Sequence, residues 1–126
     1  MTRIASGSPY ETEYGFSRAV RRGDRILVAG TAPIPAGGRP PPSSAYDQMQ
    51  RCAAIALRAL SDLGATASDV VRTRMFITDA ADADAVGKGH RECFGDAAPA
   101  ATMVVVAGLL DPAWKVEIEV EAMLSD

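Results

Sequence analysis

The sequence predicts an α+β fold in which one mostly antiparallel sheet carries two helices on one face. The segment 115–122, KVEIEVEA, alternates apolar and charged residues with the period of two that is typical of a strand. The segments 44–63 and 80–94 instead have a helical pattern of apolar residues. The predicted order is β-β-α-β-α-β-β, without a linker or low-complexity tract, so we expect a single domain over residues 1–126.

The first third of the chain is predicted to be β-structure. Strands at 17–22 and 25–30 are separated by a Gly-Asp pair, which is a signal for a two-residue hairpin turn. A further short strand at 3–6 is compatible with the sequence. Residues 31–44 are rich in proline and glycine and too irregular for a strand or helix, which indicates a surface loop.

The first predicted helix spans 44–63. Ser43 or Ser44 can cap its N-terminus, and Gly64 can end it. Apolar residues spaced three and four apart should form one stripe that faces the core: Tyr46, Met49, Ala53, Ala56, Leu60 and Leu63.

The second helix is expected at 80–94 and follows a strand at 70–79. Asp79 ends that strand and can cap the helix. Two glycines, Gly87 and Gly89, each weaken a helix by about 1 kcal/mol relative to alanine.

Two more strands, at 101–108 and 114–124, close the predicted fold. The first contains MVVVA, which is apolar at consecutive positions and therefore indicates a strand buried on both faces. Two helices can cover only one face of the sheet, and a monomer would expose a large apolar patch. We therefore expect an obligate oligomer packed sheet to sheet, with the C-terminal strand at or near the interface.

The composition excludes several classes of function. The 126 residues are 48% hydrophobic and 23% charged with a net charge of −3, so we expect no nucleic-acid partner and no anionic membrane partner. No apolar run approaches the roughly 20 residues that span a bilayer, and the first ten residues lack a signal peptide's apolar stretch. These features predict a cytoplasmic protein.

Few residues offer obvious chemistry. Cys52 and Cys93 are too few for a disulfide framework or zinc site, and we expect neither a metal nor a cofactor. The only histidine, His90, is three residues from Cys93, so the two are either a nucleophile–base pair or, as is more common, a rim histidine and a core cysteine. No Gly-rich phosphate loop is present.

Three arginines are candidate anion clamps. Arg72 and Arg74 share one face of their strand, and Arg18 lies on the early hairpin. Each can bind an anionic substrate in a bidentate manner or form an ordinary surface ion pair.

Four segments together resemble the reactive-intermediate deaminase (Rid, or YjgF-like) superfamily, from about residue 3 to 124. They are YGFSRAV, ILVAGTAPI, VVRTRMFITD and PAATMVVVAGLLDPAWKVEIEVEA, of which the last is the most specific. The resemblance implies a chorismate-mutase-like (bacillus-type) fold, with two helices on one face of the sheet. It also implies a homotrimer whose sheets form a central β-barrel.

The resemblance further implies an inter-subunit pocket in which 2-imino or enamine acids are hydrolysed to keto acids and ammonia. The family's aromatic, glycine and glutamate positions correspond to Phe16, Gly30 and Glu117. The carboxylate-binding arginine of the family is replaced by Ala101, next to Thr102, and Phe16 lacks the usual tyrosine hydroxyl.

Other relatives often carry Asn and Tyr where this chain has Gly87 and His90, so it resembles a divergent subgroup. The sequence thus leads to a hydrolase acting on a small reactive imine- or enamine-type metabolite, with Glu117 as general base. Arg18 or Arg74 would supply the missing cation, and Phe16, Gly30, Ala101 and Thr102 would line the substrate site. The alternative is a non-catalytic trimer that binds a small metabolite. An RNA-directed role, suggested by relatives labelled endoribonucleases, is disfavoured by the negative charge.

Overall fold

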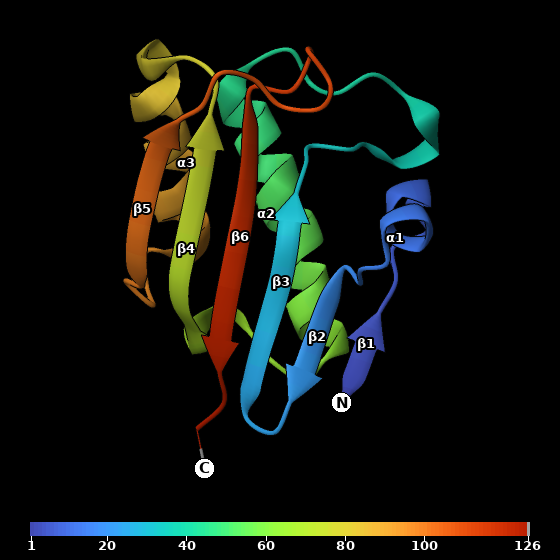
Figure 1. The fold of residues 1–126 in the computed structure, drawn as a ribbon. Helices are drawn as coiled ribbons and strands as arrows, with labels where there is room; N and C mark the ends of the chain where they lie inside the picture. Colours follow the sequence, from blue (N-terminus) through green and yellow to red (C-terminus); the bar gives the residue numbers. More distant parts are fainter. Residues whose placement is uncertain (126) are drawn as a thin grey trace.

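A computed structural model describes residues 1–125 and contains one six-stranded sheet in the order β1-β2-β3-β6-β4-β5 (Figure 1). Neighbouring strands are antiparallel except for the parallel pair β4–β5. The predicted strand order along the chain is confirmed, and the compatible short strand near the N-terminus is present. The bounds are β1 Thr2–Ile4, β2 Ala19–Arg22, β3 Arg25–Thr31, β4 Val70–Ile77, β5 Ala100–Val105 and β6 Val116–Met123.

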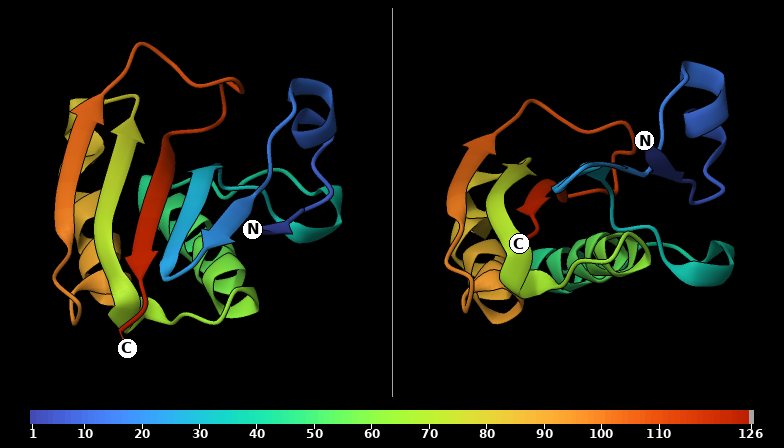
Figure 2. Two further views of the ribbon diagram at one scale, coloured as in Figure 1. Left: turned by 60° about the horizontal axis from the view of Figure 1, so that its bottom comes forward. Right: turned by 90° about the horizontal axis from the view of Figure 1, so that it is seen from below.

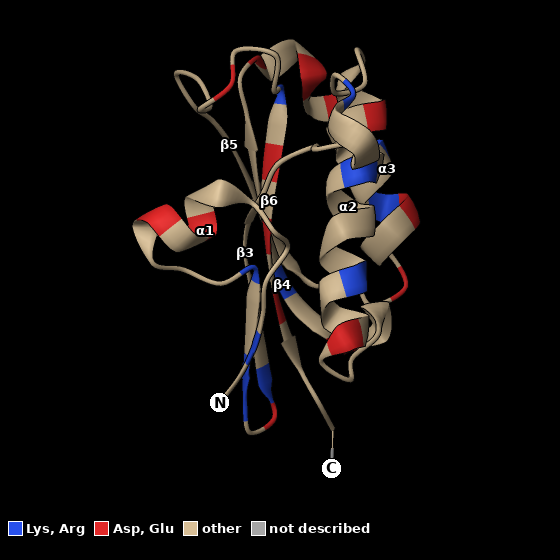
Figure 3. Ribbon diagram, turned by 90° about the vertical axis from the view of Figure 1, so that its right-hand side faces the viewer, with Lys and Arg blue, Asp and Glu red and all other residues tan. Residues whose placement is uncertain are grey.

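Two long helices, α2 (Ala45–Asp62) and α3 (Ala83–Phe94), lie on the same face of the sheet, as predicted (Figures 2 and 3). Short 3₁₀ turns precede β4 and α3 and interrupt the proline-rich loop. The turn before α3, Ala80–Asp82, takes up the start of the predicted helix because Asp79 caps the turn by accepting from the amide of Ala81.

A third helix, α1 (Pro9–Tyr14), was not predicted and lies on the opposite side of the sheet (Figure 3). Its six residues carry no apolar stripe, so hydrophobic periodicity could not reveal it. Ser8 caps it by accepting from the amide of Tyr10, and Gly15 ends it in the left-handed conformation.

The core lies between α2 and the helix-facing side of the sheet. Ser44 caps α2 by accepting from the Asp47 amide, as one of the two candidate caps predicted. Tyr46 is wrongly predicted to be a core residue, because its hydroxyl donates to Glu92 of α3 at the rim of the helix pair. The apolar face of α2 that contacts the sheet is instead formed by Ala45, Met49, Cys52, Ala53, Ala56, Ala59 and Leu60.

The strand β6 occupies the centre of the sheet and pairs with both β3 and β4. Its alternate residues Val116, Ile118, Val120 and Ala122 are buried against the helices. Glu117, Glu119 and Glu121 therefore point to the other face, which we call the open face. The segment KVEIEVEA is thus a central strand, as its alternation predicted.

The apolar strand β5 forms one edge of the sheet and ends at Val105, three residues before its predicted end. The chain then turns, and Asp111 accepts from the amide of Ala113 in this connection. Val104 and Val105 are 40% and 57% exposed in the single chain. The chain itself does not supply the burial that the run MVVVA predicted, so the oligomer stays a prediction.

Gln48 of α2 fastens the segment that leads into β6. Its amide nitrogen donates to the carbonyls of Pro42 and Ala113, and its amide oxygen accepts from the Lys115 amide. The side chain is almost completely buried, with 1% exposure. Gln48 therefore fixes the position at which β6, and with it Glu117, begins.

Replacing Gln48 by leucine should destabilise the fold by about 2–3 kcal/mol, because it leaves buried backbone groups without partners. Urea denaturation measures this difference in the free energy of unfolding. The control is Gln50→Leu on the same helix, where Gln50 is partly exposed and accepts from the thiol of Cys93, and the loss should be below about 1 kcal/mol. Equal losses in the two variants would show that Gln48 does not fasten β6.

Candidate functional site

The carboxylate of Glu117 lies directly against Gly30 of β3. A Cβ atom built on Gly30 would be 2.7 Å from Oε2 of Glu117, closer than real Cβ atoms approach other atoms. The pairing of β3 and β6 shifts register between Val28 and Thr31, so that two residues of β3 lie opposite one of β6. This bulge and the missing side chain make room for the carboxylate.

Arg18, just before β2, joins this pair. Its Nη2 donates to the carbonyl oxygen of Gly30 at 2.5 Å, and the residue is only 8% exposed. Burial lowers the pKa of Arg18, while the negative charges of Glu11 and Glu117 act in the opposite direction and raise it. The structure therefore brings together Arg18, Gly30 and Glu117, three of the residues that the sequence singled out.

The same surroundings alter the acidity of Glu117. Burial raises its pKa, the positive charge of Arg18 lowers it in part, and Glu119 raises it again. The net direction is upward from the ordinary value. A carboxylate with a raised pKa is a stronger proton acceptor, which suits a general base near neutral pH.

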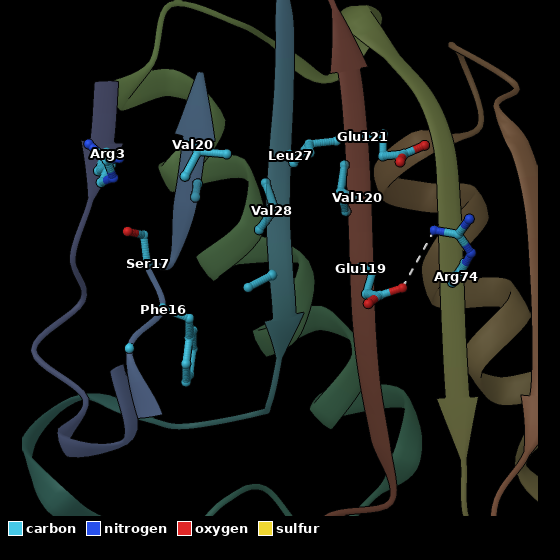
Figure 4. Close-up of a pocket in the computed structure, with 13 residues that line it drawn as sticks. Arg3, Phe16, Ser17, Val20, Leu27, Val28, Arg74, Glu119, Val120 and Glu121 are labelled. Atoms are coloured by element: carbon cyan, nitrogen blue, oxygen red, sulfur yellow. Dashed lines mark ion pairs between the residues drawn. The ribbon is translucent and has the colours of Figure 1, made fainter. Parts of the chain in front are cut away.

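Phe16 and Arg74 border a groove of about 470 Å³ on the open face (Figure 4). The Phe16 ring is 41% exposed and also lies 6.0 Å from the Arg18 guanidinium carbon. Arg74 lies across the groove and forms an ion pair with Glu119, with 3.5 Å between Nη1 and Oε1. Phe16 thus connects the groove with the buried Arg18.

Arg72 forms an ordinary surface ion pair, which is one of the two roles that the sequence allows for it. Its Nε lies 3.2 Å from Oε2 of Glu121, on the neighbouring strand. Arg72 and Arg74 do share one face of β4, as predicted, but only Arg74 borders the groove.

Ala101 and Thr102 are not brought to Glu117 within one chain. Both are exposed on the edge strand β5, where Thr102 is in register with Arg74. The strand β4 separates them from β6, which places β5 about 10 Å from β6 at the usual strand spacing. The candidate site residues therefore form two groups within the chain.

His90 and Cys93 bind different partners. The Nε2 of His90 lies 2.7 Å from the hydroxyl oxygen of Thr73, whereas the thiol of Cys93 donates to Gln50. Burial raises the pKa of the Cys93 thiol and, more strongly, that of Cys52, which keeps both protonated. These contacts favour the non-catalytic alternative for the pair, although Cys93 is half-buried rather than a core residue.

The sequence reasoning missed Glu11. This residue of α1 is 5% exposed and accepts from the amide and hydroxyl of Ser6, and its charge acts on Arg18. The signal was present, because Ser8, Pro9 and Glu11 match the capping pattern in which serine is followed by proline and, three positions on, by glutamate.

Substituting Gly30 by alanine should displace the Glu117 carboxylate and leave the fold intact. The clash involves the end of a flexible side chain, so we expect a loss of less than about 1 kcal/mol in the free energy of unfolding. The ¹³Cδ resonance of Glu117 should move. In Gly87→Ala, where no atom lies near the added methyl group, this resonance should stay and stability should rise by about 0.5–1 kcal/mol. A Glu117 resonance unchanged by Gly30→Ala would contradict the contact.

Replacing Glu117 by glutamine should change how stability depends on pH. Above the ordinary glutamate value of 4.5, the folded protein holds the Glu117 proton more tightly than the unfolded chain does. The contribution of Glu117 to the free energy of unfolding is therefore present at low pH and falls as pH rises through the raised pKa. Urea denaturation between about pH 4 and 8 should show Glu117→Gln gaining stability relative to the parent as pH rises. A constant difference across this range would contradict the raised pKa.

Among residues 1–125, no helix is both long and apolar enough to cross a membrane.

The family model described as Endoribonuclease L-PSP matches residues 7–124. An uncharacterized protein of Streptomyces coelicolor is 38% identical over 120 residues, which cover 95% of this chain and 90% of the relative. A RutC family protein of Pyrococcus abyssi is 31% identical over 95 residues, 75% of each chain.

A crystal structure from Mycobacterium tuberculosis is also similar to this chain over 98% of both chains, with a TM-score of 0.90 and 37% identity. It is described as a member of the highly conserved YjgF/YER057c/UK114 family. Such membership supports, at the level of the family, a small-metabolite deaminase or binding protein. The chain belongs to the endoribonuclease L-PSP family, within the Rid or YjgF-like superfamily.

Proposed function

We propose that the protein hydrolyses a small reactive imine- or enamine-type metabolite, with Glu117 as general base, in a cleft between the subunits of a cytoplasmic homotrimer. The observation that carries this proposal is the Glu117 carboxylate, held against Gly30 beside Arg18 with a raised pKa. This arrangement gives a base that is partly desolvated and fixed in position.

In the proposed reaction, Glu117 accepts a proton from a water molecule as the water oxygen bonds to the imine carbon. The electron pair of the C=N π bond moves to nitrogen, which takes up a proton from solvent. The amino nitrogen of the carbinolamine then receives the proton held by Glu117, the hydroxyl proton is lost to solvent, and the C–N bond breaks to release ammonia. One imine and one water thus give one carbonyl compound and one ammonia. An enamine enters the same path after protonation at carbon.

Of the two candidate cations, Arg74 is better placed for the substrate. It is half-exposed on the groove opposite Phe16, and its partner Glu119 is equally exposed. An exposed ion pair contributes at most about 1 kcal/mol, so a substrate carboxylate can take the place of Glu119. The Thr102 hydroxyl, in register with Arg74, is available as a further donor.

Arg18 is better suited to positioning Glu117. Its guanidinium is buried and already donates to Gly30. Its positive charge also limits the rise in the pKa of Glu117, which keeps a fraction of the carboxylate ionised. We therefore propose that Arg18 positions the general base Glu117 and that Arg74 binds the substrate carboxylate.

The alternative is a non-catalytic trimer that binds a small metabolite in the same cleft. Ala101 favours it, because a methyl group cannot replace the bidentate clamp that the family resemblance places at this position. The same substitution argues that a standard 2-iminoacid deaminase is not the main function of this divergent chain.

The test is a coupled assay in which an amino-acid oxidase generates 2-imino acids and keto-acid release is followed. The parent protein should accelerate release over buffer, and Glu117→Gln should lower kcat by about 10²–10⁴-fold. Arg74→Gln should raise KM by about tenfold through the lost charge-assisted contact. The matched control is Arg72→Gln, which removes an equivalent ion pair at an arginine that does not line the groove and should leave KM unchanged.

The variant Ala101→Arg should increase kcat/KM for 2-imino acids, because it restores a guanidinium at the edge strand. No acceleration by the parent protein and no gain in Ala101→Arg would refute the deaminase-type hydrolysis of 2-imino acids. A metabolite retained by the protein in native mass spectrometry, without turnover, would then support the binding alternative.

A further inference from the structure

A second cavity, of about 430 Å³, lies apart from the open-face groove. Four parts of the chain line it: the segment that leads into α1, the end of β3 with the segment after it, α2, and Arg18 just before β2. The segments before α1 and after β3 lie on the right-hand side of Figure 1. Neither Glu117 nor Phe16 lines this cavity, and Arg18 is the one residue that it shares with the surroundings of Glu117.

Two guanidinium groups line the cavity. Arg18 is more than nine-tenths buried, makes a single hydrogen bond to Gly30, and leaves its buried Nε donor without a partner among residues 1–125. Arg51 of α2 uses its Nε to bind the carbonyl of Ile34, at 2.7 Å, which leaves both terminal nitrogens available. Neither arginine forms an ion pair in the described part of the chain.

The charge of the cavity is not balanced by its own lining. No aspartate or glutamate within residues 1–125 lines it, and the acids whose charges act on Arg18, Glu11 and Glu117, lie outside. The two acids compensate only part of the desolvation of Arg18, and an unpaired buried donor is one of the features that an unseen ion explains. The cavity is therefore electrostatically suited to an anion.

The rest of the lining determines the shape and polarity of that anion. Ile34, Ile55 and neighbouring prolines supply apolar walls, and Ser8 and Tyr10 supply hydroxyl groups. A compact, fully polar anion such as phosphate would leave the apolar walls without a partner. A short hydrocarbon chain that ends in a carboxylate matches both parts of the lining.

We propose that this cavity binds a small organic monocarboxylate, with the carboxylate at Arg18 and Arg51 and a short apolar chain against Ile34 and Ile55. Arg51 is the residue on which recognition depends most, because its terminal nitrogens are free and it also holds the Ile34 segment to α2. Binding in this cavity does not require that Glu117 hydrolyse an imine, although the two sites share Arg18.

The test is a methyl NMR titration of the full chain with sodium butyrate at constant ionic strength. The δ1 methyl resonances of Ile34 and Ile55 should shift in a saturable manner, whereas that of Ile118, in the core, should not. Uncharged 1-butanol and cationic butylammonium, which have the same chain, should bind at least about tenfold more weakly because they lack the charge-assisted contact.

Two variants locate the site. Arg51→Gln should weaken butyrate binding by about tenfold or more, and Arg51→Lys should recover part of the loss because it keeps the charge. Arg72→Gln removes an equal charge on β4, away from the cavity, and should leave binding unchanged. Butyrate shifts no larger than those caused by sodium chloride, equal binding of butanol, or unchanged binding in Arg51→Gln would each overturn the proposal.

Discussion

The central position of β6 is the constraint on which the rest of the structure depends. Because β6 pairs on both sides and one face of it packs against α2, its apolar residues must alternate strictly with its glutamates. The glutamates therefore point to the open face, where Arg72 and Arg74 of β4 form ion pairs with Glu121 and Glu119. Only Glu117 faces Phe76 instead of an arginine, which leaves its carboxylate free to reach β3.

The local irregularity at Gly30 converts this free carboxylate into a candidate site. A regular β3 with a side chain at position 30 would exclude the carboxylate of Glu117 from this position. The bulge also places the carbonyl of Gly30 where it accepts from the guanidinium of Arg18. The bulge thus couples the buried cation of Arg18 with the half-buried carboxylate of Glu117 through the backbone of Gly30. The two groups influence each other's pKa in opposite directions, so that burial and Coulomb attraction together determine the protonation of Glu117.

Much of this fold was predictable because it follows from short-range patterns. The alternation of β6, the stripe of α2 and the hairpin turn each reflect one local period, and the structure has all three. The helix α1 and the buried Glu11 were missed because their signal is a capping pattern without an apolar face. The separate surroundings of Arg18 and Arg74 were also beyond prediction, since they depend on the bulge and on cross-strand register. Gly30 and Glu117 came from the family resemblance, and their contact is visible only in three dimensions.

The most direct measurement is a titration of the Glu117 side chain by NMR, with ¹³C-labelled glutamate and Glu117→Gln used to assign the Cδ resonance. A base buried against Gly30 should titrate with a midpoint above the ordinary glutamate value of 4.5. The midpoint should fall towards that value when Gly30→Ala pushes the carboxylate into solvent. A midpoint at or below 4.5 in the parent protein would contradict a desolvated Glu117 and, with it, the site built around this residue.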